Sequence, residues 1–159
     1  DKQKDFVIWK KEILKDLVPA TLRKRIDPRD GTIMWSFTSV THNEFKIFYD
    51  YFYENTIKII KKNIGQYLTP LALSVWVSDD GTLNNKTNIR IATDSFTKPE
   101  NEILQNILLT NFNLICKVCE YTRHNDKFYF LSFDKENSKK LTDIIKRHTV
   151  PCMEYKLLK

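Results

Sequence analysis

The segment 68–81, LTPLALSVWVSDDG, constrains the fold of this chain more than any other. Thr69 is a favoured N-cap residue, Pro70 suits the first helical position, and Gly81 predicts a left-handed stop beyond the last turn. We therefore predict a short apolar helix over residues 70–79 that ends in two adjacent aspartates. The negative end of the helix dipole repels exposed carboxylates by roughly 0.3 to 1 kcal/mol, which a divalent cation such as magnesium or calcium would relieve. Surface aspartates in an ordinary Asp-Gly turn are the alternative.

Helix-like and strand-like periodicities follow one another along the chain. Capping boxes support two helix starts, Thr41 with Glu44 and Thr97 with Glu100. Mixed helices and antiparallel hairpins predict an α+β fold. The predicted helices are residues 6–17, 43–53, 70–79, 98–110 and 135–148, and the predicted hairpins are residues 22–38, 82–93 and 114–133.

The first hairpin and its following helix resemble the last hairpin and helix. An offset of 96 residues aligns Asp30 with Asp126 and Phe37 with Phe133, and places a helix before each hairpin. We therefore predict about one and a half repeats. Residues 1–67 would be a partial first lobe with its connection, and residues 68–159 a second lobe. Chance coincidence of one ungapped offset is the alternative.

Composition narrows the partners that the chain can have. A formal charge of +6 and a pI of about 9.1 predict attraction to polyanions, although they do not prove a nucleic-acid partner. An odd number of cysteines, three, argues for a reducing compartment, and Cys116 and Cys119 are expected to pack on a strand rather than bind zinc. We expect neither a membrane partner nor a targeting segment within these residues.

The segment 68–81 as a whole resembles the second signature helix of the LAGLIDADG homing endonucleases, in the subgroup that writes it LTPxALAxWxxDDG. Residues 94–97, DSFT, are similar to the QSFT segment of that family, and residues 150–157, VPCMEYKL, to its IPxMxYKL ending. The sequence departs from the pattern at Ser74, Val77 and Ser78, where the subgroup usually has alanine and two larger apolar residues.

The resemblance implies a two-lobed fold and a metal site. The fold would be an αββαββα lobe preceded by the back half of a similar lobe, with antiparallel sheets that form a basic concave face. Asp80 would be the catalytic, metal-binding aspartate, and Asp79 a neighbour that contributes a backbone carbonyl. Lys156 would lie beside the metal, with a solvated lysine as the alternative. The cofactor would be Mg²⁺, if the chain is catalytically active.

The resemblance also implies limits on catalysis. The partner aspartate belongs to a first signature motif that residues 1–159 do not contain, so we expect poor metal affinity and poor cleavage from these residues alone. Thr41 stands where some relatives carry a first-lobe lysine, and the absence of that lysine also predicts poor cleavage.

Apolar and polar residues alternate on the predicted strands, which indicates sheets with one solvent-exposed face. Ile89 and Ile91 share one parity, and Asn88 and Arg90 the other. Such a face fits a major groove, with arginine and lysine on phosphates and guanines and asparagine on adenines, although an ordinary solvated face would alternate in the same way. The predicted nucleic-acid-binding residues are Arg23, Arg25, Arg29, Lys86, Asn88, Arg90, Lys117, Tyr121, Arg123 and Lys127.

The leading hypothesis is a nucleic-acid-binding module of a LAGLIDADG homing endonuclease, intron-encoded and organellar, most naturally mitochondrial. The family and a composition rich in Lys, Asn and Ile support the organelle. The alternative is a retired endonuclease that binds structured RNA, either as an intron maturase or in an organellar ribonucleoprotein such as the ribosome. A third possibility is that a second polypeptide completes the first lobe.

Overall fold

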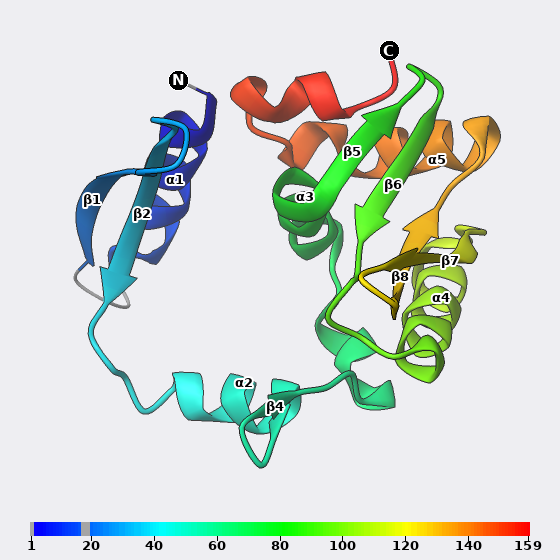
Figure 1. Cartoon of the computed structure of the whole chain (residues 1–159), viewed down its shortest axis with the longest axis horizontal. Coiled ribbons are helices and arrows are strands. Elements are labelled where there is room, and N and C mark those ends of the chain that lie inside the picture. Colours follow the sequence, from blue (N-terminus) through cyan, green and yellow to red (C-terminus); the bar gives the residue numbers. More distant parts are fainter. Residues whose placement is uncertain (1, 17–19) are drawn as a thin grey trace. The chain divides into compact units, whose positions relative to one another are not determined.

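The computed structural model describes residues 2–16 and 20–159, and the chain divides into two compact units (Figure 1). The N-terminal unit is Asp1–Ile47 with Val150–Met153. The C-terminal unit is Phe48–Thr149 with Glu154–Lys159. The site described below lies wholly in the C-terminal unit.

The N-terminal unit contains a helix and a two-stranded hairpin. Helix α1 (Lys2–Leu14) is followed by β1 (Ala20–Ile26) and β2 (Ile33–Ser39), which pair antiparallel. The predicted hairpin 22–38 turns at Asp30 and Gly31, where Asp30 Oδ1 accepts the Thr32 N–H at 2.9 Å and Gly31 has φ +73°. The predicted helix 6–17 corresponds to α1, and Leu17 lies outside the described residues.

The segment between the two predicted lobes has more structure than we expected. Helix α2 (Phe45–Phe52) begins two residues later than predicted, and the Glu44 N–H donates to His42 Nδ1 at 3.3 Å, so the Thr41 capping box was wrong. A small hairpin, β3 (Tyr53–Glu54) and β4 (Ile57–Lys58), and a 3-10 helix, η1 (Lys62–Tyr67), follow α2. The sequence predicts only a connection there.

Residues 70–145 of the C-terminal unit have the predicted αββαββα order. The capping box at Thr97 and Glu100 is confirmed. All strand pairs are antiparallel, in the order β5-β6-β8-β7. Two 3-10 helices, η2 (Lys146–His148) and η3 (Pro151–Lys156), follow along the chain, and residues 151–153 of η3 belong to the N-terminal unit. The elements are α3 (Pro70–Asp80), β5 (Gly81–Asn84), β6 (Asn88–Ala92), α4 (Lys98–Phe112), β7 (Lys117–Arg123), β8 (Asp126–Ser132) and α5 (Lys135–Ile145).

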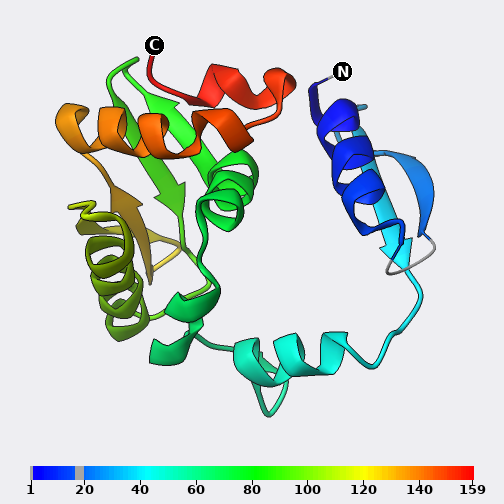
Figure 2. The same cartoon turned by 180° about the vertical axis from the view of Figure 1, so that it is seen from behind.

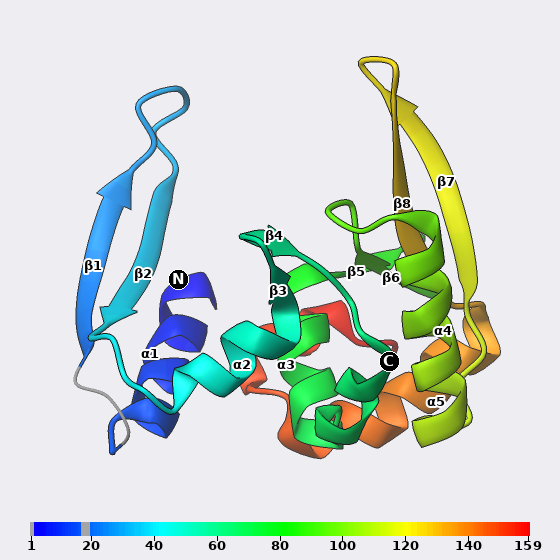
Figure 3. The same ribbon diagram turned by 90° about the horizontal axis from the view of Figure 1, so that it is seen from below.

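Helices α4 and α5 cover one face of this sheet, as the two opposite views show (Figures 1 and 2). Ile89, Ile91 and Leu131 point into the core beneath these helices and are fully buried. Burying each such side chain contributes about 1.5–3 kcal/mol, which fixes the strand register. We call the opposite face the open face, because neither α4 nor α5 covers it. Strands β7 and β8 extend as a ribbon beyond β5 and β6 (Figure 3), because β8 pairs with β6 only over residues 130–132.

The glycine after the two aspartates is needed for a reason other than the one predicted. Gly81 has φ −77° and ψ 148°, an extended conformation, so the predicted left-handed stop was wrong. A Cβ atom at Gly81 would lie 2.3 Å from the backbone oxygen of Val77. The glycine thus allows β5 to start directly against the last turn of α3.

The departures from the signature pattern are all buried. Ser74, Val77 and Ser78 are at most 3% exposed. The Ser74 hydroxyl is 3.0 Å from that of Thr149, so its burial is compensated by a hydrogen bond. Among the described residues, no helix is both long enough and apolar enough to cross a membrane.

Candidate functional site

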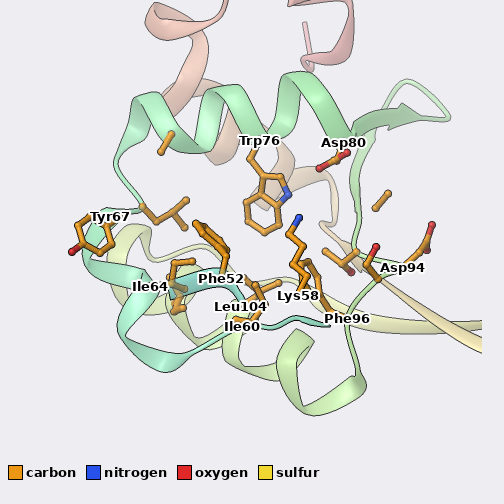
Figure 4. A pocket seen from close by; sticks show the side chains of 16 residues that line it. Phe52, Lys58, Ile60, Ile64, Tyr67, Trp76, Asp80, Asp94, Phe96 and Leu104 are labelled. Carbon is orange, nitrogen blue, oxygen red and sulfur yellow. The ribbon is translucent and has the colours of Figure 1, made fainter. Parts of the chain in front are cut away.

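Helix α3 delivers Asp80 to the edge of an apolar recess. The helix starts at a true N-cap, since Thr69 Oγ1 accepts the Ala72 N–H at 3.2 Å. Ala72, Trp76 and Asp80 are spaced by four residues and line one recess of about 460 Å³. Figure 4 shows Trp76 and Asp80 on the side of α3 that faces Phe96 and Lys58. The acidic end of the helix therefore borders a cavity of its own unit.

A second recess, of about 300 Å³, lies on the open face of the sheet. Asp80, Arg90, Asp94 and Tyr121 line it, together with side chains of β5 and β8. Asp80 and Asp94 line both recesses. These two carboxylates therefore stand where the recesses meet, which makes this junction the best candidate for a reactive site.

Hydrogen bonds fix the loop that carries Asp94. The Tyr121 hydroxyl donates to Asp94 Oδ1 at 2.9 Å, and this bond raises the pKa of Tyr121. The fully buried Asn101 donates its amide to the carbonyls of Phe96 (3.1 Å) and Thr97 (3.0 Å). Asp94 belongs to the DSFT segment, yet the sequence did not predict it as a site residue.

The Lys156 side chain contacts the end of α3 by donating hydrogen bonds to two backbone carbonyls. Its Nζ donates to the carbonyl oxygens of Ser78 (2.6 Å) and Asp79 (3.0 Å). The ammonium therefore offsets the negative end of the helix dipole. The Asp79 carbonyl, which we expected to be a metal ligand, is the acceptor of one of these bonds.

Lys58 is a cation of the site that sequence reasoning missed. Its Nζ lies 5.3 Å from the centroid of the Phe96 ring, and its side chain lines the larger recess with Asp80. Figure 4 shows the side chain pointing toward Trp76 and the end of α3. The lysine-rich connection gave no signal that singled out this residue, because only the β3–β4 hairpin brings it to the recess.

The donor set suits a hard divalent ion only in part. Within residues 2–16 and 20–159, no group of three His, Cys, Asp or Glu side chains could hold a metal. Asp80 and Asp94 supply two carboxylates at one junction. Mg²⁺ commonly binds through one or two carboxylates and keeps several waters, so the two residues fit such an ion.

Burial raises the pKa of the Cys116 thiol to about 12, so this cysteine is a packing residue.

Four of the predicted nucleic-acid-binding residues are charged or aromatic side chains on the open face. Lys117, Tyr121 and Arg123 lie on β7 with the same parity, and Arg90 lies on β6 opposite Ser132. The Cζ atom of Arg90 is 3.7 Å from the centroid of the Phe130 ring. Lys86 is exposed in the β5–β6 turn, at φ 57°.

The structure places the other predicted residues elsewhere. Arg23 and Arg25 are exposed on β1, with the same parity, in the N-terminal unit. Arg29 forms an ion pair with Asp27 at 2.7 Å and thereby lowers the pKa of that carboxyl.

Asn88 and Lys127 have structural partners in the C-terminal unit. The Asn88 amide donates to the Phe133 carbonyl at 2.9 Å, so it joins β6 to the end of β8. Lys127 points to the face opposite to that of Phe128 and forms an ion pair with Glu120 at 2.9 Å. Neither side chain lines the open-face recess, although Asn88 has the same parity as Arg90 on β6.

Residues 1–141 match the family described as "LAGLIDADG DNA endonuclease family". The cytochrome b mRNA maturase bI2 of Saccharomyces cerevisiae is 30% identical over 127 residues, which cover 76% of this chain and 30% of the maturase. The probable intron-encoded DNA endonuclease 3 of Mycosarcoma maydis is 30% identical over 135 residues, which cover 80% of this chain and 96% of that protein.

A solved structure is also similar to this chain. The homing endonuclease I-WcaI, bound to its DNA recognition sequence, is similar over 98% of this chain and 71% of that chain, with a TM-score of 0.80 and 28% identity. This chain spans less than a third of the yeast maturase but nearly all of the Mycosarcoma protein. The match over residues 1–141 shows that the chain belongs to the LAGLIDADG DNA endonuclease family.

Proposed function

We propose that residues 1–159 form a nucleic-acid-binding module of a homing endonuclease, in which Asp80 is the central catalytic residue. The observation that carries this proposal is the junction of the two recesses. There the carboxylates of Asp80 and Asp94 face a common space, and the cations Lys58 and Arg90 line its two sides. Carboxylates flanked by cations suit phosphodiester chemistry, because a phosphate and a hard cation can both be bound.

Asp80 and Asp94 would hold Mg²⁺ at this junction, with water and substrate oxygens as the remaining ligands. When bound, the ion supplies an activated water and neutralises the charge of the leaving oxygen. Lys58 would place its ammonium near the scissile phosphate. Lys156 would act mainly by holding the last turn of α3, so that Asp80 keeps its position.

The open face would bind the duplex beside this junction. Arg90, Lys117 and Arg123 supply three cations on one face, and Lys86 extends the basic surface at the β5–β6 turn. Arginine and lysine in this arrangement contact phosphates and guanine edges in a major groove. The solved structure of I-WcaI with its DNA recognition sequence supports DNA as the partner.

We further propose that residues 68–159 are one lobe and residues 1–67 part of another. Residues 1–159 contain one signature motif, and we propose that they cleave poorly when isolated from any further segment or polypeptide that supplies a second acidic helix. The names of the relatives, an mRNA maturase for cytochrome b and intron-encoded endonucleases, support an intron-encoded protein of an organelle, and we propose the mitochondrion.

The test begins with selection of bound sequences from a randomised duplex library, followed by a Mg²⁺-dependent cleavage assay on the selected sites. We expect Asp80→Asn to abolish cleavage and leave binding within about twofold. Asp143→Asn is the matched control, because Asp143 lies on α5 and pairs with Lys146. Cleavage that survives Asp80→Asn would show that the junction is not the active site.

RNA binding is the second candidate function. Its support is the similarity to the cytochrome b mRNA maturase bI2, which extends over 76% of this chain. Under this alternative, the chain binds structured RNA through the same cations, and Asp80→Asn changes neither affinity nor any splicing activity. Stable RNA binding without selection of any duplex sequence would favour it over the endonuclease.

A further inference from the structure

We propose that Phe130 is a positioning residue for nucleic-acid binding, because its ring holds the guanidinium group of Arg90 in place before the nucleic acid arrives. Phe128 does the same for Arg123, more weakly. The inference rests on the proposed nucleic-acid function, and it assigns a role to two apolar side chains of the open face.

The geometry is a continuous row of rings with an arginine at each end. We call Tyr121, Phe128 and Phe130 the aromatic strip. The ring centroid of Tyr121 is 5.6 Å from that of Phe128 and 6.1 Å from that of Phe130. Arg90 Cζ lies 3.7 Å from the Phe130 centroid, and Arg123 Cζ lies 4.9 Å from the Phe128 centroid.

All members of this row lie on the open face. Strand alternation puts Phe128 and Phe130 opposite in parity to the buried Leu131, and the rings themselves are half-buried. The strip is anchored at one point, because the Tyr121 hydroxyl donates to Asp94, whose loop is fixed by Asn101. The aromatic strip is therefore tied to the loop that carries Asp94.

A guanidinium group that is held on a ring has less freedom to lose on binding. Immobilising one long side chain weakens association by about 2- to 12-fold, so fixing it in advance recovers that factor. The cation–π attraction directs the plane of the guanidinium over the ring and leaves its N–H groups at the periphery, where they can reach phosphate or guanine oxygens. The closer pair, Phe130 with Arg90, should contribute more than Phe128 with Arg123.

The Phe130 ring has a second effect on Arg90 at the recess beside the aromatic strip. Arg90 lines it together with Asp80 and Asp94. A guanidinium released from the ring could turn toward these carboxylates and form an ion pair, which would withdraw it from the nucleic acid and neutralise the acidic junction. The Phe130 ring competes with that ion pair.

A double-mutant cycle tests the proposal. The affinities of the full chain, Phe130→Leu, Arg90→Gln and the double variant are measured by fluorescence anisotropy with a mixed-sequence DNA duplex and an RNA hairpin of equal length. Phe130→Tyr keeps a ring and should restore binding. Tyr129→Leu is the matched control, because Tyr129 lies on β8 with the opposite parity.

We expect Phe130→Leu to weaken binding by about 3- to 10-fold without changing the slope of affinity against salt, because no charge is lost. Arg90→Gln should weaken binding and lower that slope by about 0.9. In the Arg90→Gln background, Phe130→Leu should have no further effect, since the ring acts through the arginine. Phe128→Leu should weaken binding less than Phe130→Leu does.

Additive losses in the cycle, or equal binding by Phe130→Leu and the unmodified chain, would overturn the positioning role. If Phe130→Leu fails to fold, as thermal unfolding would show, the Phe130→Tyr variant and the Phe128→Leu cycle with Arg123→Gln decide the question. Failure of the unmodified chain to bind either probe would instead overturn the proposed function, so the two failures are distinct.

Discussion

Replacing Lys156 with methionine tests whether this lysine stabilises the end of α3. The Nζ atom donates to two carbonyl oxygens, at 2.6 and 3.0 Å, that no helical N–H can satisfy. Hydrogen bonds to charged groups contribute roughly 1.5–3 kcal/mol, and the half-buried position of Lys156 lowers the value because water screens the charge. Methionine keeps most of the apolar stem. We therefore expect a loss of about 1–2 kcal/mol in the free energy of unfolding.

Urea unfolding at pH 7, followed by circular dichroism, measures this loss. With a denaturant slope of about 2 kcal/mol per molar urea, the midpoint should fall by about 0.5–1 M. Lys139→Met on α5 is the control, because Lys139 is exposed and its substitution removes the same charge. Hydrogen exchange of residues 70–81 should accelerate only in Lys156→Met. A Lys156→Met midpoint equal to that of the control would refute the stabilising role.

Three further predictions concern the same unit. Gly81→Ala should destabilise it by about 1–3 kcal/mol in urea unfolding, because its Cβ would lie 2.3 Å from the Val77 oxygen; a neutral result would contradict that close approach. Asp134→Ala removes the N-cap of α5 and should lower stability by about 1 kcal/mol. The pKa of Asp134 is lowered by the Asn137 N–H, so this difference should be present above about pH 4 and vanish as the pH falls through the lowered pKa. The difference between the absorbance titrations of the unmodified chain and Tyr121→Phe should show a tyrosine whose pKa lies above the ordinary value, because the hydrogen bond to Asp94 raises the pKa of Tyr121; a difference curve with an ordinary or lowered tyrosine pKa would contradict this.

The arrangement of the C-terminal unit follows from local sequence signals. Alternation at Ile89 and Ile91 fixed which face of β6 is buried, and the capping box at Thr97 fixed the start of α4. These signals act over a few residues and agree with the tertiary packing, so sequence reasoning located each hairpin and helix of the αββαββα order. The same reasoning placed Asp80 at the end of α3.

The parts of the site that sequence reasoning missed depend on unusual backbone geometry or on distant contacts. Lys58 reaches the recess through a turn in which Asn55 and Thr56 have φ values of 46° and 70°, and a β-branched threonine rarely adopts such a conformation. Asp94 gains its place from the Tyr121 hydroxyl, 27 residues away along the chain. No pattern of a few residues encodes either fact.

The position of Lys156 changes the argument for a metal. Two aspartates at the negative end of a helix suggested a missing cation, and a divalent ion was one candidate. The structure supplies a cation from the chain itself, since the Lys156 ammonium binds the last carbonyls of α3. Helix electrostatics therefore no longer require a metal, and the proposal of Mg²⁺ rests on the two carboxylates that share the junction and on the family. If that is correct, Mg²⁺ should raise the thermal stability of the unmodified chain, and Asp94→Asn should reduce this effect while leaving the metal-free stability of α3 unchanged. A Mg²⁺ effect that Asp94→Asn leaves intact would place the ion away from the junction.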